Sequence, residues 1–401
     1  MMSYYVIITP FFPGPNAWWG GYCYDFANAV RQTGKYQVVV FIPGAGVDYE
    51  IGGISVYRFQ VRLLPTNIFP FLWTRFNQRS FLAAVKRAGI NPNDIAVCHG
   101  HTANFAIYPG AVKALNRKCL TLLHHHDLAS FGLNVGRLRH LWLYNMIQFP
   151  ILRKWHERMD VHVFVSELSR RSFIEAPDAS WTDFGEYRKQ MRWLPYRPAR
   201  IHDSIVLYNG IDATMFKPGP RKMHTGFVIG CIGNFTPLKN HITLLRAVAI
   251  LQKQGLVDIS VIMIGSGEEL LHCKEYARAN SIHVEFRDEV EHKELEEFYH
   301  SIDLFVLPSL FEGLGCVFLE AIACGTPFLA CEGQAIEELM LDATKWLFKR
   351  GDAVDLAAKI KNYIFAKPRP SQSLNRDVAI GHLVSSFIER VQKKQCSLAE
   401  G

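Results

Sequence analysis

Several common sequence signals are absent from this chain of 401 residues, and each absence excludes a class of protein. The nine cysteines form no Cys-x-x-Cys pair and have no zinc-finger spacing, which is typical of free thiols in a reducing compartment. No Gly-x-Gly-x-x-Gly opens either half, which argues against a nicotinamide dehydrogenase. The sequence contains no recognised nucleic-acid-binding module, so a nucleic-acid partner is not expected.

A leader and a long apolar run are also missing. The start, MMSYYVIITPFFPG, has no charged n-region, and Pro10 and Pro13 interrupt its apolar stretch, so no signal peptide is predicted. Asn145, Gln148 and Pro150 break the most apolar internal stretch, residues 141–152, well short of the ~18 apolar residues of a spanning helix. We therefore expect a cytoplasmic protein that is not integral to a membrane.

The composition is that of a folded protein with an uneven charge. Hydrophobic residues make up 49% and charged residues 20%, and the length suits two domains. Residues 1–212 carry 23 Lys+Arg against 14 Asp+Glu, a net +9, and the remainder carries 21 against 23, a net −2. A basic first half suits an anionic acceptor or the cytoplasmic face of an anionic membrane, and a solvated basic face explains it equally well.

Short apolar runs alternate with helical spacing along the chain. Such alternation predicts α/β domains with parallel sheets covered by helices on both faces. We expect a domain over residues 1–216 with an insertion at about 177–200, and a second over residues 217–401. A final helix over residues 374–394 is expected, and its packing back across the first domain is left open. The first-domain strands are expected at residues 4–9, 38–42, 95–99, 120–124, 161–165 and 205–208, and those of the second at 227–232, 259–264 and 304–307.

The most informative segment is PSLFEGLG, which joins a strand ending at Leu307 to a helix that carries Glu320. Loop amides and a helix N-terminus at the carboxyl end of a strand form an anion site, and Gly313 and Gly315 allow close approach of the backbone. Glu312 would lie at the mouth of this loop. The alternative is that Glu312 caps the helix and Glu320 is solvated.

Residues 308–327 resemble the hallmark of the retaining glycosyltransferases of family 4, PS-x-x-EG-x-G-x-x-x-LEA-x-A-x-G-x-P with its Glu-x7-Glu. The resemblance implies the GT-B fold, in which two Rossmann-like, doubly wound parallel-sheet domains face a central cleft. It spans most of the chain and is weakest at residues 58–86 and 177–200. Further matching features are Gly20-Gly21, His126-Asp127, Ser166, Asn209-Gly210-Ile211-Asp212 with Phe216 and Pro218, residues 233–239, and Gly265-Ser266-Gly267.

The resemblance also implies a role for each site residue. Glu312 would contact the hydroxyls of the donor sugar and Glu320 the ribose, while Lys239 would neutralise the leaving diphosphate. A positioned cation stabilises such charge in any fold, although Lys239 could instead be solvated. The catalytic candidates are His126, Lys239 and Glu312, and the donor-binding candidates are Gly20, Gly21, Gly233, Asn234, Lys239, Gly265, Arg287, Glu312, Gly313, Leu314, Gly315 and Glu320.

Two departures from the family pattern concern the phosphate site. Asn234 stands where the family usually has Arg, and an amide cannot supply a charged, bidentate fork. Arg287-Asp288 stands where the family often has Gly. Arg287 is therefore a candidate substitute cation, and an exposed surface Arg is the other interpretation.

Metal and cofactor are both predicted to be absent. No Asp-x-Asp pair occurs, so the expected chemistry is metal-independent. Neighbouring strand residues point to opposite faces, so the triplet 124–126 is not expected to converge on an ion. Its last member, His126, aligns best with the family's cleft histidine because Asp127 follows it. His99 and His101 are interpreted as structural, with a place in the acceptor cleft as the alternative.

The function implied is transfer of a sugar from a UDP- or GDP-linked donor to a saccharide, lipid-linked or protein acceptor, with retention at the anomeric carbon. The alternatives are a nucleotide-sugar 2-epimerase and a non-catalytic sugar-nucleotide-binding protein. Two segments that mix aromatic and basic residues, 58–87 and 137–158, could lie on a lipid surface. Amphipathic core helices with snorkelling cations are the favoured interpretation of both.

Overall fold

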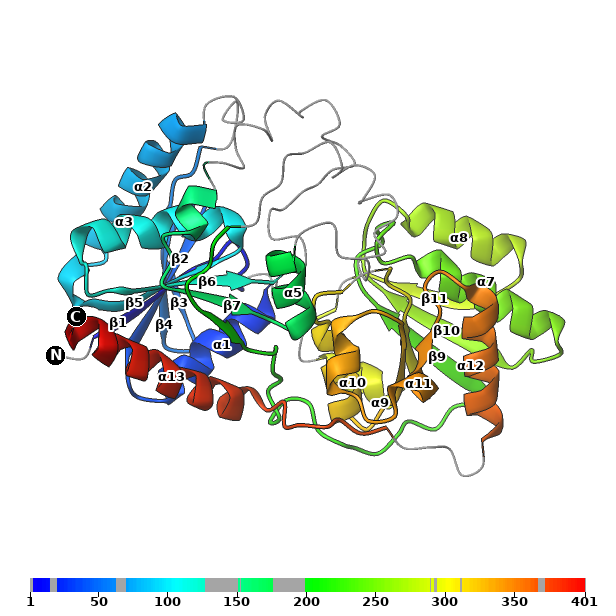
Figure 1. The fold of residues 1–401 in the computed structure, drawn as a ribbon. Coiled ribbons are helices and arrows are strands. Elements are labelled where there is room, and N and C mark those ends of the chain that lie inside the picture. Colours follow the sequence, from blue (N-terminus) through cyan, green and yellow to red (C-terminus); the bar gives the residue numbers. More distant parts are fainter. Residues whose placement is uncertain are drawn as a thin grey trace. The chain divides into compact units, whose positions relative to one another are not determined.

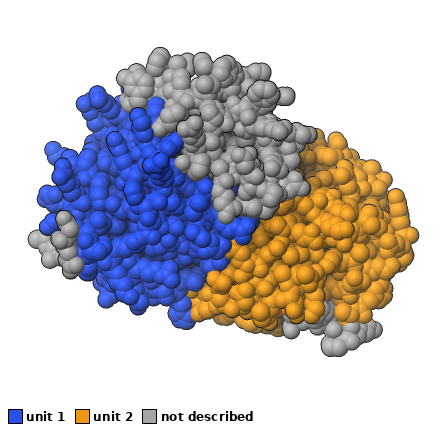
Figure 2. Space-filling view, in the orientation of Figure 1, with its two compact units in different colours: residues 1–209, 380–401 blue, residues 210–379 orange. Residues whose placement is uncertain are grey.

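The computed structural model describes residues 3–14, 20–62, 70–126, 151, 153–175, 199–288, 290–291, 294–310, 312–366 and 372–400. The chain divides into two compact units, residues 1–209 with 380–401, and residues 210–379 (Figures 1 and 2). Asp127 and residues 177–198 of the expected insertion lie outside the described residues, as does most of the aromatic and basic segment 137–158.

Unit 1 is built on an eight-stranded sheet in the order β3-β4-β2-β1-β5-β6-β7-β8. All neighbouring pairs are parallel except the edge pair β3–β4. The sequence analysis did not anticipate that edge pair. The strands are β1 (Tyr4–Ile8), β2 (Gln37–Pro43), β3 (Tyr49–Ile51), β4 (Ile54–Phe59), β5 (Ile95–His101), β6 (Leu120–His125), β7 (Val161–Phe164) and β8 (Ser204–Val206).

Both faces of this sheet are buried under helices. Tyr5 and Ile7 of β1 join a core with α1 (Gly21–Gln32) and α13 (Ile380–Glu400), while Val6 and Ile8 join the core under α2 (Pro70–Arg87) and α3 (Ile107–Leu115). Because successive side chains point to opposite faces, a strand covered on both sides must be apolar throughout. The remaining elements of the unit are η1 (Pro92–Asp94), η2 (Ala103–Ala106) and α5 (Glu167–Glu175).

The C-terminal helix belongs to unit 1 although the chain reaches it from unit 2 (Figure 1). It begins at Ile380, later than the expected residue 374, because Leu374 forms an extended bridge with Met340 and Ala379 another with Ile211. The amide of Gln395 donates to the carbonyl of Ala96 at 2.8 Å. Apolar residues of α13 fill the α1 side of the core, namely Val384, Phe387, Ile388 and Val391.

Unit 2 contains a six-stranded parallel sheet in the order β11-β10-β9-β12-β13-β14. Numbered within the unit, this is the order 3-2-1-4-5-6 of a doubly wound nucleotide-binding fold. The strands are β9 (Phe227–Ile232), β10 (Ile259–Ile264), β11 (His283–Arg287), β12 (Leu304–Leu307), β13 (Phe328–Cys331) and β14 (Leu347–Phe348). The helices are α7 (His241–Lys253), α8 (Leu270–Ala279), α9 (Leu295–His300), α10 (Cys316–Ala323), η4 (Ala335–Leu339), α11 (Ala343–Trp346) and α12 (Ala353–Phe365).

A chain of buried histidines lies between β6, β7 and the segment before β7. The Nε2 of His162 donates to the carbonyl of His156 at 3.0 Å, so its Nδ1 accepts from the Nε2 of His125 at 2.9 Å. Burial lowers the pKa of His162 to about 3 and that of His125 well below its ordinary value, so both rings are neutral. In the unfolded chain the histidine pKa is about 6.5, so between these two pKa values the residue binds a proton when unfolded but not when folded.

We expect acid to destabilise unit 1 through this histidine. Between pH 7 and pH 5 the unfolded His162 becomes protonated, so the free energy of unfolding should fall by about 2 kcal/mol from this residue alone. His162→Phe should make the pH dependence of the urea midpoint shallower, whatever its effect at pH 7. The exposed His272→Ala is the control. Equal slopes for His162→Phe and the unaltered protein would contradict the expectation.

Candidate donor site and the unit 1 histidine cluster

The loops that follow β9 and β12 lie side by side in unit 2. The two strands are neighbours, and from them the sheet is built outward in both directions. Ligands of doubly wound sheets bind at this point, outside the carboxyl ends of the strands, because the connections on either side leave toward opposite faces. The backbone N–H of Leu310 donates to the carbonyl of Leu238 at 2.8 Å, which ties the two loops together.

Lys239 and Glu312 meet in these loops. The Nζ of Lys239 donates to Oε1 of Glu312 at 2.5 Å, with side-chain exposures of 27% and 12%. The two residues lie 73 positions apart in the chain, so the sheet order, not local sequence, brings them together. A half-buried ammonium and a mostly buried carboxylate at a switch point can bind an anion and accept from hydroxyl groups, respectively.

Glycines allow the loops after β9 and β10 to pack closely. Gly265 has φ +139°, and a Cβ there would stand 2.3 Å from the carbonyl oxygen of Gly233. Gly267 has φ +147°, and a Cβ there would stand 2.4 Å from the carbonyl oxygen of Phe235. The N–H of Phe235 also donates to the carbonyl of Ser266 at 2.8 Å. These close contacts hold the backbone of Gly233 and Asn234 in place beside Lys239.

Glu320 is buried on α10, with 7% of the residue exposed. The hydroxyl of Tyr299 donates to its Oε2 at 2.8 Å. Burial, followed by the adjacent Glu320 carboxylate, raises the pKa of Tyr299 well above its ordinary value, so the phenol stays a donor. Glu320 is therefore not a solvated surface residue. The sequence analysis missed Tyr299, because no motif marks a partner 21 residues away on a different helix.

Gly315 is the N-cap residue of α10. Its backbone is extended, and no side chain among the described residues caps the helix. Leu314 before it is buried, at 5% exposure, which places the Glu-Gly-Leu-Gly loop over the core rather than in solvent. Gly313 precedes both residues, and Phe311 lies outside the described residues. A helix N-terminus in this position favours negative charge.

The two departures from the family pattern lie at the same edge of the sheet. Asn234 is exposed directly after β9. Arg287 ends β11, and its guanidinium makes a fork with Glu285 through bonds of 2.7 and 3.0 Å. The carbonyl of Arg287 accepts from the N–H of Gly265 at 3.1 Å. In this arrangement the charge of Arg287 is matched by Glu285.

The remaining candidate site residues, Gly20, Gly21 and His126, lie in unit 1. Gly20 has φ +86°, and a Cβ there would stand 2.5 Å from the backbone carbon of Phe11, so the turn into α1 at Gly21 requires glycine. Tyr22 follows, and its ring lies 4.9 Å from the ring of His126. The glycine pair and His126 thus share one end of the unit 1 sheet, where β1 and β5 are neighbours.

Four histidines extend from His126 into the core along β5 and β6. His99, His101 and His124 are fully or almost fully buried, and the rings of His99 and His124 stack at 5.3 Å. Burial lowers the pKa of His126 to about 3, so its imidazole is neutral. Sequence reasoning treated His99 and His101 separately from the triplet, because the period of two groups the histidines only within each strand, and the pairing of β5 with β6 brings the two pairs together.

The aromatic and basic segment on α2 packs in part against unit 1. On this helix, Phe81, Ala84 and Val85 are buried in the core, as an amphipathic core helix requires. Near its start, the guanidinium of Arg62 lies 4.8 Å from the Trp73 ring and 4.1 Å from the Phe76 ring. Among the described residues, no helix combines the length and apolar character that crossing a membrane would need.

Two family matches and one relative cover most of the chain. Residues 213–373 match the glycosyl transferases group 1, and residues 20–179 match glycosyltransferase family 4. The GDP-mannose-dependent alpha-(1-6)-phosphatidylinositol monomannoside mannosyltransferase of Mycolicibacterium smegmatis is 26% identical over 394 residues, or 92% of this chain and 91% of the relative.

Solved structures show the same fold. Sucrose-phosphate synthase from Thermosynechococcus elongatus superposes with a TM-score of 0.65 at 16% identity, over 97% of this chain and 94% of that one. The catalytic domain of starch synthase IV from Arabidopsis thaliana, bound to ADP and acarbose, gives 0.66 at 14% identity over 99% and 100%. The fold is GT-B, with two parallel-sheet α/β domains. The chain belongs to the group 1, family 4 glycosyltransferases, and it is a glycosyltransferase enzyme.

We expect Gly265→Ala to damage the loops beside Lys239. The new Cβ would meet the carbonyl of Gly233, and the residue would keep a strained positive φ, so unit 2 should lose about 1–3 kcal/mol of stability. The control is Gly255→Ala, which also has positive φ (+88°) but nothing within 4 Å of the new Cβ. Thermal unfolding should show the larger loss for Gly265→Ala, and equal losses would refute the packing argument.

Proposed function

We propose that this glycosyltransferase moves a sugar from a UDP- or GDP-linked donor to a saccharide, lipid-linked or protein acceptor, with retention and without a metal ion. The observation that carries the proposal is the Lys239–Glu312 pair at the switch point of unit 2. A nucleoside diphosphate sugar needs both functions in one place, a cation for the phosphates and an acceptor for sugar hydroxyls.

Lys239 is assigned to the leaving group. Cleavage of the bond between the anomeric carbon and the phosphate oxygen leaves negative charge on the β-phosphate, and a positioned ammonium stabilises that charge as it develops. The α10 N-terminus at Gly315, with the amides near Gly313 and Leu314, adds the favourable end of a helix dipole. Asn234 and the backbone of Gly233 and Gly265 complete the proposed phosphate site, so no divalent ion is required.

Glu312 and Glu320 are assigned to hydroxyl groups of the donor. Glu312 is charge-paired with Lys239, and a bound donor would be contacted by both partners. Glu320 is fixed by Tyr299, which suits an acceptor for the ribose. Arg287, already matched by Glu285, is a weaker substitute for the missing family Arg. The relative from Mycolicibacterium smegmatis is named as GDP-mannose-dependent, which supports a nucleoside diphosphate sugar as donor.

Of the unit 1 candidates, His126 is assigned to the donor sugar near the reacting centre, and Gly20-Gly21 to the diphosphate. A neutral imidazole can donate or accept a hydrogen bond there. The described part of the proposed site suggests no covalent nucleophile, so we propose same-face attack by the acceptor hydroxyl, whose proton passes to the departing phosphate. The relative acts on a phosphatidylinositol mannoside, which supports a lipid-linked acceptor met at an anionic membrane face. The epimerase and non-catalytic alternatives are not favoured, because the family and the named relative are transferases.

We expect Lys239→Met to lower kcat for transfer by about 10²–10³-fold, because the leaving diphosphate loses its cation. Lys239→Arg should recover part of this loss. The control is Lys345, which is also paired with a carboxylate, 2.9 Å from Asp342 on the surface. Lys345→Met should leave kcat unchanged. Transfer that survives both Lys239→Met and Glu312→Ala would show that the site has been placed wrongly.

The stereochemistry of the product tests the proposed same-face attack. If it operates, the anomeric configuration of the donor is kept, and the proton spectrum of the product at early times should show the coupling constant of the donor anomer. An inverted product would overturn this mechanism without affecting the assignment of Lys239. The donor itself can be identified beforehand by thermal shift with UDP, GDP and their sugars, because a ligand of the folded state raises the unfolding temperature.

A further inference from the structure

A buried cluster of one thiol and four imidazoles lies on the α1 and α13 side of the unit 1 sheet. His99 and His101 alternate along β5, and His124 and His126 alternate at the end of β6, so each pair points to one face. Cys23 approaches them from α1. The ring of Phe26 packs against three of these histidines, His99, His101 and His124.

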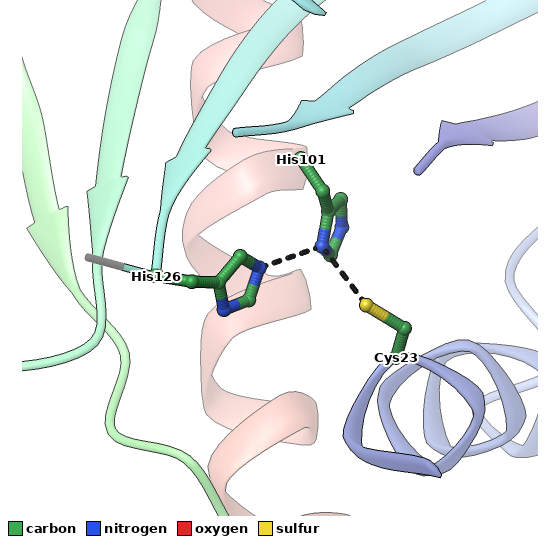
Figure 3. A group of neighbouring side chains, drawn as sticks. All are labelled: Cys23, His101 and His126. Carbon is green, nitrogen blue, oxygen red and sulfur yellow. Dashed lines mark hydrogen bonds between the residues drawn. The ribbon is translucent and has the colours of Figure 1, made fainter. Parts of the chain in front are cut away.

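We propose that Cys23, His101 and His126 form a binding site for a thiophilic divalent metal ion of the zinc type (Figure 3). Figure 3 shows the thiol of Cys23 and the ring of His126 both pointing toward one nitrogen of the His101 ring. One ligand atom from each of the three residues lies within 4.8 Å of the others. All three residues belong to unit 1, so the site does not depend on unit 2.

Two of the three distances between the ligand atoms are close to those of a tetrahedral zinc site. Sγ of Cys23 lies 3.6 Å from Nδ1 of His101, which lies 2.9 Å from Nε2 of His126. Zinc bonds of about 2.3 Å to sulfur and about 2.05 Å to nitrogen, at tetrahedral angles, separate S from N by about 3.6 Å and N from N by about 3.3 Å. The third pair, Sγ of Cys23 and the ligand nitrogen of His126, lies within 4.8 Å, so rotations of these side chains would have to bring the trio around an ion.

The hydrogen bonds within this trio compete for one atom, although Cys23 also contacts the hydroxyl of Thr9 at 3.5 Å. Nδ1 of His101 carries either one proton or one lone pair, so it can make one full hydrogen bond, yet both Cys23 and His126 face it. Within the described part of the chain, Nε2 of His101 and both ring nitrogens of His124 have no hydrogen-bond partner. Buried polar groups without a partner destabilise the folded state. A metal ion would use the crowded atoms as ligands.

The donor set selects the metal. A thiolate with two imidazoles suits zinc, cobalt or copper, whereas magnesium and calcium prefer oxygen ligands. Without a metal, burial raises the pKa of Cys23 to about 12, so the thiol is protonated. Binding would break the S–H bond, release the proton to water and form the metal–thiolate bond. Three protein ligands leave the fourth position of the ion to water.

Metal binding would also remove His126 from the donor sugar, a consequence that rests on the proposed function. Nε2 of His126, the atom nearest His101, would become a ligand, and the ring would be fixed toward the core. The site would therefore inhibit sugar transfer instead of assisting it. Transfer without a metal and inhibition by a metal are compatible, because the proposed leaving-group site lies in unit 2 around Lys239.

The test is an anaerobic titration of the metal-free, full-length protein with Co²⁺, followed by competition with Zn²⁺. One Co²⁺ per chain should bind and give a thiolate-to-cobalt charge-transfer band together with strong tetrahedral d–d bands. Cys23→Ser should lose the charge-transfer band, and His101→Asn should weaken Zn²⁺ by about 100-fold or more, since even outer partners of metal ligands contribute about 10–100-fold.

Two controls separate the site from other side chains. Cys396→Ser removes the exposed thiol and should leave the spectrum unchanged. His125→Asn removes a buried histidine on the opposite face of β6, and should cost stability without changing Co²⁺ binding. Absence of stoichiometric binding, binding without the thiolate band, or an unaltered spectrum in folded Cys23→Ser would overturn the proposal.

A transfer assay reads the consequence for His126 separately. Zn²⁺ should inhibit the unaltered protein, EDTA should restore its activity, and Cys23→Ser should resist inhibition. Full transfer by protein whose spectrum shows an occupied site would overturn the link to His126. If the metal-free protein transfers no sugar at all, the proposed function fails, while the cobalt spectrum still decides whether the metal site exists.

Discussion

Both sheets of this enzyme depend on one constraint, that a parallel sheet must be covered on both faces. The strands carry apolar side chains on both faces of the sheet, so each crossover connection has to place a helix over one face or the other. Where the direction of winding reverses, adjacent loops leave toward opposite faces and a crevice forms between them. In unit 2 that point lies between β9 and β12 and holds Lys239 and Glu312. In unit 1 it lies between β1 and β5 and holds the turn at Gly20 and the end of β5 at His101.

Much of this was predictable because the physical signals are local. The strands expected at residues 227–232 and 304–307 coincide with β9 and β12, since short apolar runs mark their limits. The edge strands were harder. Strand β11 has exposed or half-buried residues throughout, so it lacks the continuous apolar run that identifies a central strand. The start of the last helix was predicted six residues too early, because Leu374 and Ala379 form extended bridges with Met340 and Ile211.

The site was predictable only where a motif carries it. Glu312 and Glu320 share one motif, and their separate environments, a lysine for one and a buried phenol for the other, follow from chain segments far away in sequence. The histidine cluster shows the same limit more plainly. Four imidazoles meet because β5 and β6 are paired in a register that sets His101 opposite His124, and no spacing in the sequence states which strands are neighbours.

The return of α13 has a consequence for the order in which the protein is made. Unit 2 is one continuous piece of chain, whereas unit 1 is interrupted by the whole of unit 2. Val384, Phe387, Ile388 and Val391 complete the core of unit 1, and they are synthesised only after the whole of unit 2. One face of the unit 1 sheet therefore stays partly uncovered until α13 has been synthesised, whereas unit 2 has all its residues before that point and can fold while unit 1 is still incomplete.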